Sequence, residues 1–398
     1  MTPAARLQAA IEILSALDQT AEPADKVIRE FFRARRYAGS KDRAAVAERV
    51  YDCLRHFYSY SWRMNGSDPR HLVIASVQAE GADPAELFTG TAYSPSALSS
   101  EESAALAAPL REPAPRHVQG EFPEWLEPEL SKAFGDDLLP EMQAMLGRAA
   151  IDIRVNTLKT SREKLIAALA EEGFEAEPTP RASTGLRLSG ATTAKLSASK
   201  LFLEGHFEFQ DEAAQICAEL CGAAPGARVL DYAAGAGGKA LALAALMQNR
   251  GEIHAHDISS GRLAMLTPRA ERAGVKNITT FTALPLGRYH VVLLDAPCSG
   301  TGTWRRQPEL RVRFSDARLK ELIALQAELL EKTASLVKPG GKLVYATCSV
   351  LPSENDDQIA AFLAKHADFA RAEDFFCASP YRDHSDGFFT AVLERTAS

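Results

Sequence analysis

The chain has 398 residues, of which 46% are hydrophobic and 24% are charged, and its formal net charge is −7 at pH 7. This composition is ordinary for a soluble globular protein, and the length leaves room for two or three domains with a full hydrophobic core. The acidic total argues against a protein that coats nucleic acid indiscriminately, and the longest apolar run, Ala240 to Met247, is far below the roughly 20 residues of a membrane helix.

Residues 1–81 are predicted to form a small helical domain. Apolar residues recur there at helical spacing: Val46, Val50, Leu54 and Phe57. Basic residues cluster nearby: Arg29, Arg33, Arg35, Arg36, Lys41 and Arg43. Such a cluster fits a solvated helix face as well as it fits a surface that binds RNA.

Residues 82–120 are rich in Ala, Pro and Ser and show little periodicity, which predicts a linker. Residues 121–206 are predicted to form a small α+β subdomain. Its expected elements are an amphipathic helix over 130–146, a strand over 151–155 and a helix over 162–173, followed by further short strands.

From residue 207 to residue 398, strands and helices alternate. The expected strands are Ala227–Leu230, Glu252–His256, Ile278–Phe281, Tyr289–Leu294, Lys342–Tyr345 and Phe388–Leu393. Helices are expected to begin at Lys239, Ser260 and Ser353, and another to run over Asp316–Val337. This alternation predicts an α/β domain with a doubly wound, Rossmann-like parallel sheet whose final strand is antiparallel.

A glycine-rich loop follows the first strand of this sheet and runs from Asp231 to Lys239 as Asp-Tyr-Ala-Ala-Gly-Ala-Gly-Gly-Lys. Glycines let the backbone approach a ligand where the next helix begins. Asp257 ends the second strand, 20 residues after Gly237, and is placed to accept hydrogen bonds from ribose hydroxyls, although Asp is also a common helix cap. A cofactor that contains a nucleoside is implied, but the loop alone would also suit NAD.

Two of the six cysteines follow apolar, β-rich runs. Cys298 lies in Asp295-Ala-Pro-Cys-Ser-Gly-Thr-Gly302, and Cys348 lies in Ala346-Thr-Cys-Ser-Val350. Both thiols should emerge at strand ends, which form the ligand-binding edge of an open α/β sheet. A hydride-transfer enzyme has no evident use for two thiols there. An enzyme that methylates carbon 5 of a pyrimidine does need a thiol, because that carbon is not nucleophilic until a thiolate adds to carbon 6.

The cysteines contain no C-x-x-C pair and no evenly spaced framework, so neither a disulfide scaffold nor a zinc site is indicated. The remaining four are expected to be structural: Cys53, Cys217, Cys221 and Cys377. The pair at the strand ends therefore favours S-adenosylmethionine over NAD as the cofactor.

Further segments extend this pattern in order along the chain: Arg154 to Leu158, Phe209 to Ala213, Asp231 to Lys239, Asp295 to Gly302, Arg305-Arg306-Gln-Pro308-Glu309, Tyr345 to Asn355 and Asp386-Gly-Phe-Phe. Together they resemble the RNA 5-methylcytosine methyltransferases of the Sun (Fmu, RsmB) type, over about residues 122–398. The segment from Phe32 to Arg55 is similar to the NusB-like RNA-binding domain of the branch that acts on small-subunit rRNA.

The resemblance implies that Cys348 attacks carbon 6 of the target cytosine and that Cys298 assists release of the enzyme. Asp295 would contact ring nitrogen 3 or the exocyclic amine. The implied contacts to S-adenosylmethionine are Ala233, Ala234, Gly235, Ala236, Gly237, Gly238, Lys239, Asp257, Arg262 and Asp295. The implied RNA contacts are Lys239, Arg305, Arg306, Arg33 and Arg36.

One departure from the family lies after the third strand, where Thr282-Ala283 replaces the acidic residue that usually contacts adenine. Adenine recognition must therefore differ here. A DNA cytosine methyltransferase also uses a Pro-Cys nucleophile, but Cys348 in Thr-Cys-Ser favours RNA. A decayed, non-catalytic assembly factor would be expected to lack Cys348 or the glycine loop, and both are present.

Small-subunit rRNA is the expected substrate, and tRNA remains an alternative. Because a cytosine must leave its helical stack to react, we expect a partly assembled or single-stranded target. We also expect a cytoplasmic monomer with no membrane segment, since the first residues show no signal-peptide pattern.

Overall fold

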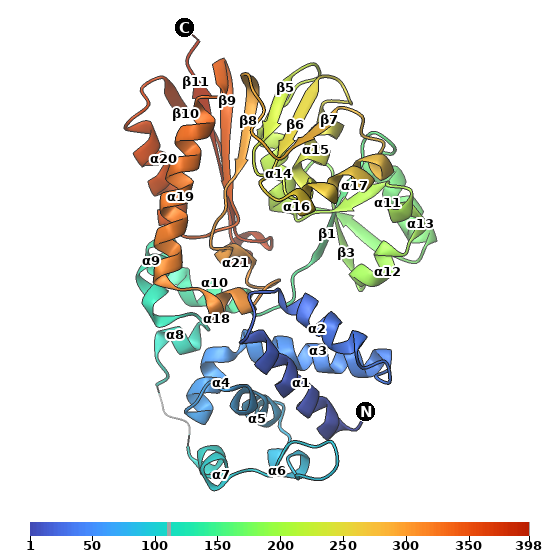
Figure 1. Ribbon diagram of the computed structural model, residues 1–398, viewed down its shortest axis with the longest axis vertical. Helices are drawn as coiled ribbons and strands as arrows, with labels where there is room; N and C mark the ends of the chain where they lie inside the picture. Colours follow the sequence, from blue (N-terminus) through green and yellow to red (C-terminus); the bar gives the residue numbers. More distant parts are fainter. Residues whose placement is uncertain (110–112, 398) are drawn as a thin grey trace. The chain divides into compact units, whose positions relative to one another are not determined.

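The computed structural model describes residues 1–109 and 113–397. The chain divides into two compact units, which we call the helical unit and the sheet unit. The helical unit comprises Met1–Gly147 and Trp304–Phe314, and the sheet unit comprises Arg148–Thr303 and Ser315–Ser398 (Figure 1). No described helix is long and apolar enough to cross a membrane.

The first part of the helical unit confirms the predicted run of helices: α1 Pro3–Leu17, α2 Ala24–Arg33, α3 Ser40–Arg55, α4 Phe57–Met64 and α5 Pro69–Ala79. The apolar positions of α3 are buried as expected, with Val46 and Val50 fully enclosed. Phe57 instead begins α4, so the apolar repeat crosses a helix boundary.

The expected linker at 82–120 is wrong for much of its length. It contains α6 (Pro84–Leu87), α7 (Ser100–Ala107) and α8 (Arg116–Gln119). Phe88 is buried in the core of the helical unit, and Leu98 and Leu106 pack against that core. A capping box between Ser99 and Glu102 begins α7, and Glu102 also binds Arg70. Local capping and scattered apolar anchors therefore fold a segment that lacks a periodic pattern.

Residues 121–147, which are expected to begin the α+β subdomain, pack with the helical unit. They form the short 3-10 helices η1 (Glu124–Leu126) and η2 (Gly135–Asp137) and the helices α9 (Glu127–Phe134) and α10 (Leu138–Ala144). The single helix expected over 130–146 is broken because Gly135 has a φ of 54°.

The segment Trp304–Phe314, with α18 (Glu309–Arg313), joins this unit from far along the chain. Arg311 is fully buried and donates from Nη1 to the Arg55 carbonyl oxygen at 3.0 Å.

The small sheet of the sheet unit has the antiparallel order β2-β3-β1-β4. Its strands are β1 Ile151–Val155, β2 Glu175–Pro178, β3 Gly185–Ser189 and β4 Phe207–Phe209. Leu165 and Leu169 of α11 (Arg162–Glu171) pack against this sheet, and the short helices α12 (Thr193–Ser197) and α13 (Lys200–Leu203) precede β4.

The large sheet has the order β10-β11-β9-β8-β5-β6-β7. Its strands are β5 Arg228–Asp231, β6 Glu252–His256, β7 Ile278–Phe281, β8 Tyr289–Asp295, β9 Val337–Thr347, β10 Phe369–Ala378 and β11 Phe388–Arg395. Strands β5 to β9 are parallel, and β11 lies antiparallel on β9, as the sequence predicts. The edge strand β10 was not predicted, because charged residues and a register shift between Arg371 and Phe375 interrupt its pattern.

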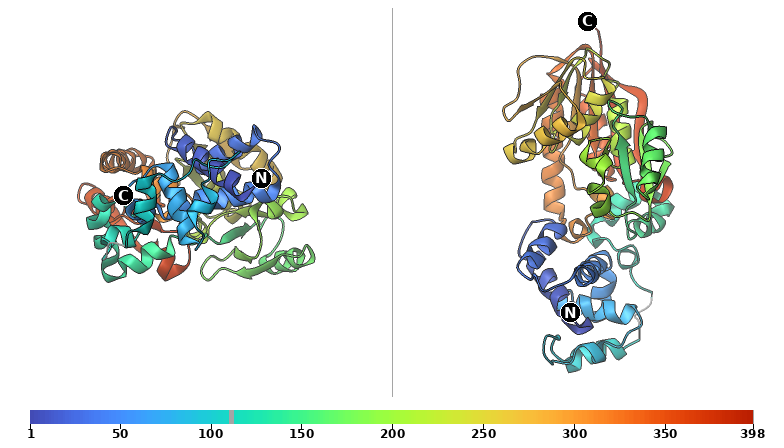
Figure 2. Two further views of the ribbon diagram at one scale, coloured as in Figure 1. Left: turned by 90° about the horizontal axis from the view of Figure 1, so that it is seen from below. Right: turned by 90° about the vertical axis from the view of Figure 1, so that its right-hand side faces the viewer.

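Helices cover both faces of the large sheet (Figures 1 and 2). Val229 and Val291 face the side where α14 (Glu212–Leu220), α15 (Gly238–Leu246) and α17 (Leu266–Ala273) pack. Leu230 and Val292, one position along, face α19 (Asp316–Ala334) and α20 (Asp356–Leu363). This alternation confirms the Rossmann-like α/β fold and leaves the carboxyl ends of the strands open for a site.

Candidate active site

The two predicted thiols meet where β8 and β9 end. The two loops are joined just before the cysteines by a hydrogen bond from the Ala296 N–H to the Ala346 carbonyl at 2.8 Å. The sulfur atoms of Cys298 and Cys348 lie 3.4 Å apart, and both side chains are half-buried. Neighbouring parallel strands thus bring together two residues that are 50 positions apart in the sequence.

The pKa of Cys298 is raised well above its ordinary value by the hydrogen bond with Cys348, by burial, and by the charges of Cys348 and Glu354. At neutral pH Cys298 therefore keeps its proton and can donate a hydrogen bond to the Cys348 sulfur. The other cysteines are placed differently. Cys53 and Cys217 are buried in hydrophobic cores, where desolvation raises their pKa to about 12, and Cys377 is exposed on β10.

A buried carboxylate that sequence reasoning did not single out joins the two cysteine loops. Glu354, in the 3-10 helix η4 (Pro352–Glu354), has no exposed surface. Its Oε1 accepts from the Ser299 N–H and from Gln326 Nε2, both at 2.9 Å, and its Oε2 accepts from Ser299 Oγ at 2.5 Å. Gln326, on α19, also donates to the Pro297 carbonyl at 2.9 Å. The residues on either side of Cys298 are thus fixed to the loop that follows Cys348.

The loop after Cys348 is held by its own hydrogen bonds. Ser349 Oγ lies 3.2 Å from Ser299 Oγ and 3.1 Å from Thr301 Oγ1. Asn355 accepts from Thr347 Oγ1 at 2.5 Å and donates to the Ser349 carbonyl at 2.9 Å.

A close backbone contact adds to these bonds. The Gly302 N–H donates to the Cys348 carbonyl at 3.0 Å, and the Gly387 N–H donates to the Gly302 carbonyl at 2.8 Å. A side chain on Gly302 would overlap the Gly387 backbone, so the Gly300-Thr-Gly302 and Asp386-Gly motifs are needed for this contact.

The glycine-rich loop lies between β5 and α15, as predicted. Gly235 and Gly237 have φ angles of 54° and 82°, which favour glycine. A Cβ atom on Gly237 would overlap the side chain of Leu266, whereas one on Gly235 would meet no neighbouring atom. Gly237 must therefore be glycine for packing, and Gly235 faces open space.

Asp257 follows β6 and is almost fully buried. Its Oδ2 accepts from the Gly235 N–H at 2.9 Å, and its Oδ1 accepts from the Ser259 N–H and from Arg262 Nη2, both at 2.8 Å. Ser259, and not Asp257, caps α16 (Ser260–Ala264), so the contacts of Asp257 support the turn before that helix and the glycine loop.

Lys239 and Asp295 form an ion pair between Nζ and Oδ2 at 2.6 Å. Burial lowers the pKa of Lys239, but the Asp295 carboxylate and other nearby acids outweigh that effect and raise it. Asp231 lies at the end of β5 with 1% of its surface exposed. Burial and the Asp295 charge raise its pKa to about 7, against the effect of Lys239.

These residues fit S-adenosylmethionine. Neither oxygen of Asp231 has a well-formed hydrogen bond among the described residues, and Gly235 borders open space at the N-terminal end of α15. Anionic groups and helix N-termini suit a ligand that bears ribose hydroxyls, an amino group and a carboxylate.

Two further arginines support the glycine loop and were not predicted as site residues. Arg269 Nη1 donates to the Ala236 carbonyl at 2.6 Å, and Arg154 Nη1 donates to the Gly238 carbonyl at 2.8 Å. Arg154 is buried, and desolvation lowers its pKa to about 10. The Arg154-Val-Asn-Thr-Leu158 motif drew attention to Arg154, and no sequence motif drew attention to Arg269.

The predicted RNA contacts differ in exposure. Arg33 and Arg36 are exposed on the helical unit, and their side chains have no ion pair or hydrogen bond among the described residues. Arg306 is also exposed, whereas Arg305 is only 7% exposed. Arg305 belongs to the segment that packs into the helical unit, where its side chain is enclosed.

Comparisons with known proteins agree with this geometry. A family model described as 16S rRNA methyltransferase RsmB/F matches residues 222–394, and one for the RsmF/B-like ferredoxin-like domain matches residues 122–195. The crystal structure of PH0851 superposes with a TM-score of 0.79 at 27% identity and covers 99% of both chains.

Two curated relatives are similar over most of this chain. The probable ribosomal RNA small subunit methyltransferase B of Synechocystis sp. is 35% identical over 302 residues, which cover 70% of this chain and 67% of that protein. The ribosomal RNA small subunit methyltransferase B of Klebsiella pneumoniae is 36% identical over 284 residues, which cover 68% of this chain and 65% of that protein. The aligned region thus spans about two thirds of each relative. The chain belongs to the RsmB/F family of 16S rRNA methyltransferases, whose methyl donor is S-adenosylmethionine.

Proposed function

We propose that this protein methylates carbon 5 of a cytosine in small-subunit rRNA through a covalent adduct on Cys348. The observation that carries the proposal is the 3.4 Å approach of the Cys298 and Cys348 sulfurs at the ends of β8 and β9. The glycine loop follows β5, which pairs with β8 in the same sheet. The thiols and the cofactor loop therefore share one edge of the sheet.

The first step makes carbon 5 nucleophilic. The Cys348 thiolate adds to carbon 6 of the cytosine, and electron density moves through the ring to carbon 5. S-adenosylmethionine supplies the methyl group that carbon 5 then takes up. Asp295, oriented by the Lys239 ammonium, accepts a hydrogen bond from the exocyclic amine and stabilises the saturated ring.

The second step restores the aromatic ring. Carbon 5 loses its proton to solvent water, the double bond between carbons 5 and 6 forms again, and the Cys348 sulfur leaves with the electrons of its bond to carbon 6. Cys298 retains its proton because its pKa is raised, so it can donate a hydrogen bond to the departing sulfur. This is the physical basis for assigning Cys298 to release.

The substrate assignment is supported by relatives named as small-subunit rRNA methyltransferases. A tRNA substrate is the alternative, and a non-catalytic assembly factor is disfavoured because the thiol pair and glycine loop are complete. We further propose a monomer that acts in the cytoplasm and uses the helical unit as a NusB-like RNA-binding domain. Arg33 and Arg36, which are exposed and have no ion pair within residues 1–109 and 113–397, support that role.

A trapping experiment tests the proposal. Cys298→Ala protein is incubated with S-adenosylmethionine and unmodified small-subunit rRNA, and the products are separated on a denaturing gel. We expect a covalent protein–RNA adduct that is absent from Cys298→Ala/Cys348→Ala protein. Sequencing of the attached RNA identifies the cytosine. Cys377→Ala is the matched control because it removes an exposed thiol on the edge strand β10, which β11 separates from β9.

Two results would contradict the proposal. An adduct that persists without Cys348 would exclude it as the nucleophile. If wild-type protein formed 5-methylcytosine in tRNA but not in rRNA, as judged by mass spectrometry of digested nucleosides, the rRNA assignment would be wrong and the chemistry would stand.

A further inference from the structure

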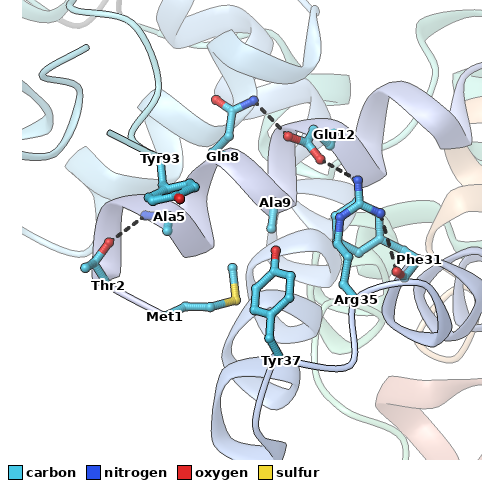
Figure 3. Close-up of a pocket in the computed structure, with 10 residues that line it drawn as sticks. All are labelled: Met1, Thr2, Ala5, Gln8, Ala9, Glu12, Phe31, Arg35, Tyr37 and Tyr93. Carbon is cyan, nitrogen blue, oxygen red and sulfur yellow. Dashed lines mark hydrogen bonds and ion pairs between the residues drawn. The ribbon is translucent and has the colours of Figure 1, made fainter. Parts of the chain in front are cut away.

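A cavity of about 560 Å³ lies in the helical unit, within the range of about 300–1,000 Å³ that small-molecule sites occupy. It is formed by α1, by the end of α2 and by two loops (Figure 3). Tyr37 and Tyr93 line it, although 74% and 83% of their surfaces are exposed. Two aromatic rings at the mouth of a cavity are costly to leave in water unless they bind something.

The backbone at Tyr93 is strained. Tyr93 has a φ of 67°, the left-handed region that bulky residues rarely adopt. The surrounding turn holds it there, with the Gly90 N–H bound to the Pro95 carbonyl and the Ser94 N–H bound to the Thr91 carbonyl, both at 2.9 Å. Backbone strain of this kind is concentrated at functional sites, where it holds a side chain in the position that binding requires. No hydrophobic core requires it, because the ring is exposed.

The inner wall of the cavity is already ordered. The Arg35 guanidinium lies 3.7 Å from the centre of the Phe31 ring, and its Nη2 binds Glu12 at 3.1 Å. Gln8 Nε2 donates to Glu12 Oε1 at 3.2 Å. A flat ligand would therefore meet fixed aromatic surface together with amide and carboxylate groups, so its binding would cost little reordering of side chains.

Three basic residues lie close in sequence to Phe31, Arg35 and Tyr37 of the cavity lining. Arg33, Arg36 and Lys41 are exposed, and within residues 1–109 and 113–397 none of them has an ion pair or a side-chain hydrogen bond. Arg36 directly precedes Tyr37, so a cation and a ring are presented by the same loop. Proteins that bind single-stranded nucleic acid combine basic side chains, which contact the phosphate backbone, with aromatic side chains, which stack on the bases.

We propose that this cavity binds an unpaired base of the RNA, with Tyr37 and Tyr93 stacking on the base and Arg33, Arg36 and Lys41 contacting phosphates. The proposal rests on the function proposed above for the choice of RNA as ligand. It places a nucleotide-binding site on the helical unit that is separate in sequence from the cysteines. The protein would thereby select rRNA that still has single-stranded segments.

The test measures RNA binding without methyl transfer. Full-length protein is titrated into a short fluorescein-labelled oligoadenylate and, separately, into a labelled RNA duplex, without S-adenosylmethionine, and fluorescence anisotropy is followed. Stacking contributes about 1–3 kcal/mol per base, so Tyr37→Ala/Tyr93→Ala should weaken oligoadenylate binding by roughly tenfold or more. Tyr37→Phe/Tyr93→Phe keeps both rings and should bind like wild type.

Tyr93→Gly separates the function from folding. Glycine relieves the positive φ, so the thermal midpoint should not fall, yet RNA affinity should fall because the ring is removed. Arg33→Ala/Arg36→Ala should reduce the slope of log affinity against log salt by about one for each phosphate that the variant no longer neutralises.

Equal oligoadenylate affinity for wild type and the double alanine variant would overturn the proposal and leave the cavity to a different ligand. Duplex binding that falls as strongly as single-strand binding would also overturn it. The trapping experiment with Cys298→Ala protein is independent of these results. If the adduct forms but the tyrosine variants bind oligoadenylate as tightly as wild type, only the cavity proposal is refuted. If binding depends on the tyrosines but no adduct forms with rRNA, only the methylation proposal is refuted.

Discussion

Glu354 gives a prediction whose size follows from its contacts. Its buried carboxylate accepts three hydrogen bonds, from the Ser299 N–H, from Ser299 Oγ and from Gln326 Nε2. Glu354→Ala leaves the Ser299 N–H and the Gln326 amide without this acceptor, and each buried unsatisfied group costs about 1–3 kcal/mol. With the added cavity, we expect the free energy of unfolding to fall by about 3–5 kcal/mol.

Glu354→Gln keeps the shape and one acceptor oxygen, which can still accept from the Ser299 N–H and the Gln326 amide. The loss should therefore be about 1–2 kcal/mol, the difference between a charged and a neutral hydrogen-bond partner. Urea unfolding followed by circular dichroism measures both values. Glu321→Ala, an exposed carboxylate on α19, is the matched control and should change stability by less than about 0.5 kcal/mol.

The same variants test positioning of the thiols. Because the charge of Glu354 helps to raise the pKa of Cys298, Glu354→Gln should lower that pKa and speed alkylation of Cys298 by iodoacetamide, as read by peptide mass spectrometry. Adduct formation in the Cys298→Ala background should slow, because Ser299 and the loop after Cys348 are no longer fixed to each other. Wild-type stability together with an unchanged adduct rate in Glu354→Ala would refute the reasoning.

Four further outcomes are expected. The pKa of Asp231 is raised from 3.8 to about 7 in the folded protein, so the stability from its bound proton is complete below about pH 4 and lost as the pH rises through about 7. The thermal midpoint of wild type should therefore fall as the pH rises from about 4 to about 7, and Asp231→Asn should make this fall smaller. Gly237→Ala should abolish S-adenosylmethionine binding in calorimetry, because the added methyl group overlaps Leu266. In wild-type protein, alkylation of Cys298 should become appreciable only at alkaline pH, since its pKa is raised. Ile258 is 86% exposed and follows Asp257, which binds the glycine loop, so we expect it to pack on adenine, and Ile258→Ala should raise the dissociation constant for S-adenosylmethionine severalfold without lowering stability.

The large sheet was predictable because its central strands are short apolar runs that end in turns. Glu252–His256 and Ile278–Phe281 match the structure at both ends. The edge strand β10 was missed because an edge carries charges on a largely exposed surface. The helix expected across Gly135 failed for a different reason, since one residue with positive φ ends it despite an apolar pattern that continues.

Domain boundaries were harder to predict, because contacts between distant segments leave no periodic signal. Arg311 is fully buried in the helical unit although it lies among sheet-unit residues in sequence. Nothing in its local pattern distinguishes it from an exposed arginine. The same limit applies to Arg305, because its motif indicates an accessible cation while its side chain is only 7% exposed.

The thiols could be placed at strand ends from sequence, but their separation could not, because it depends on three segments that are far apart in the chain. Glu354 ties the loop after β9 to Ser299 in the loop after β8, and the contact of Gly302 with Gly387 fixes the loop after β8 to the segment before β11. If either constraint is removed, the Cys298 thiol no longer holds its hydrogen bond to the sulfur that must leave carbon 6. A site of this kind requires buried carboxylates and close glycines for geometry, even where they never touch the base.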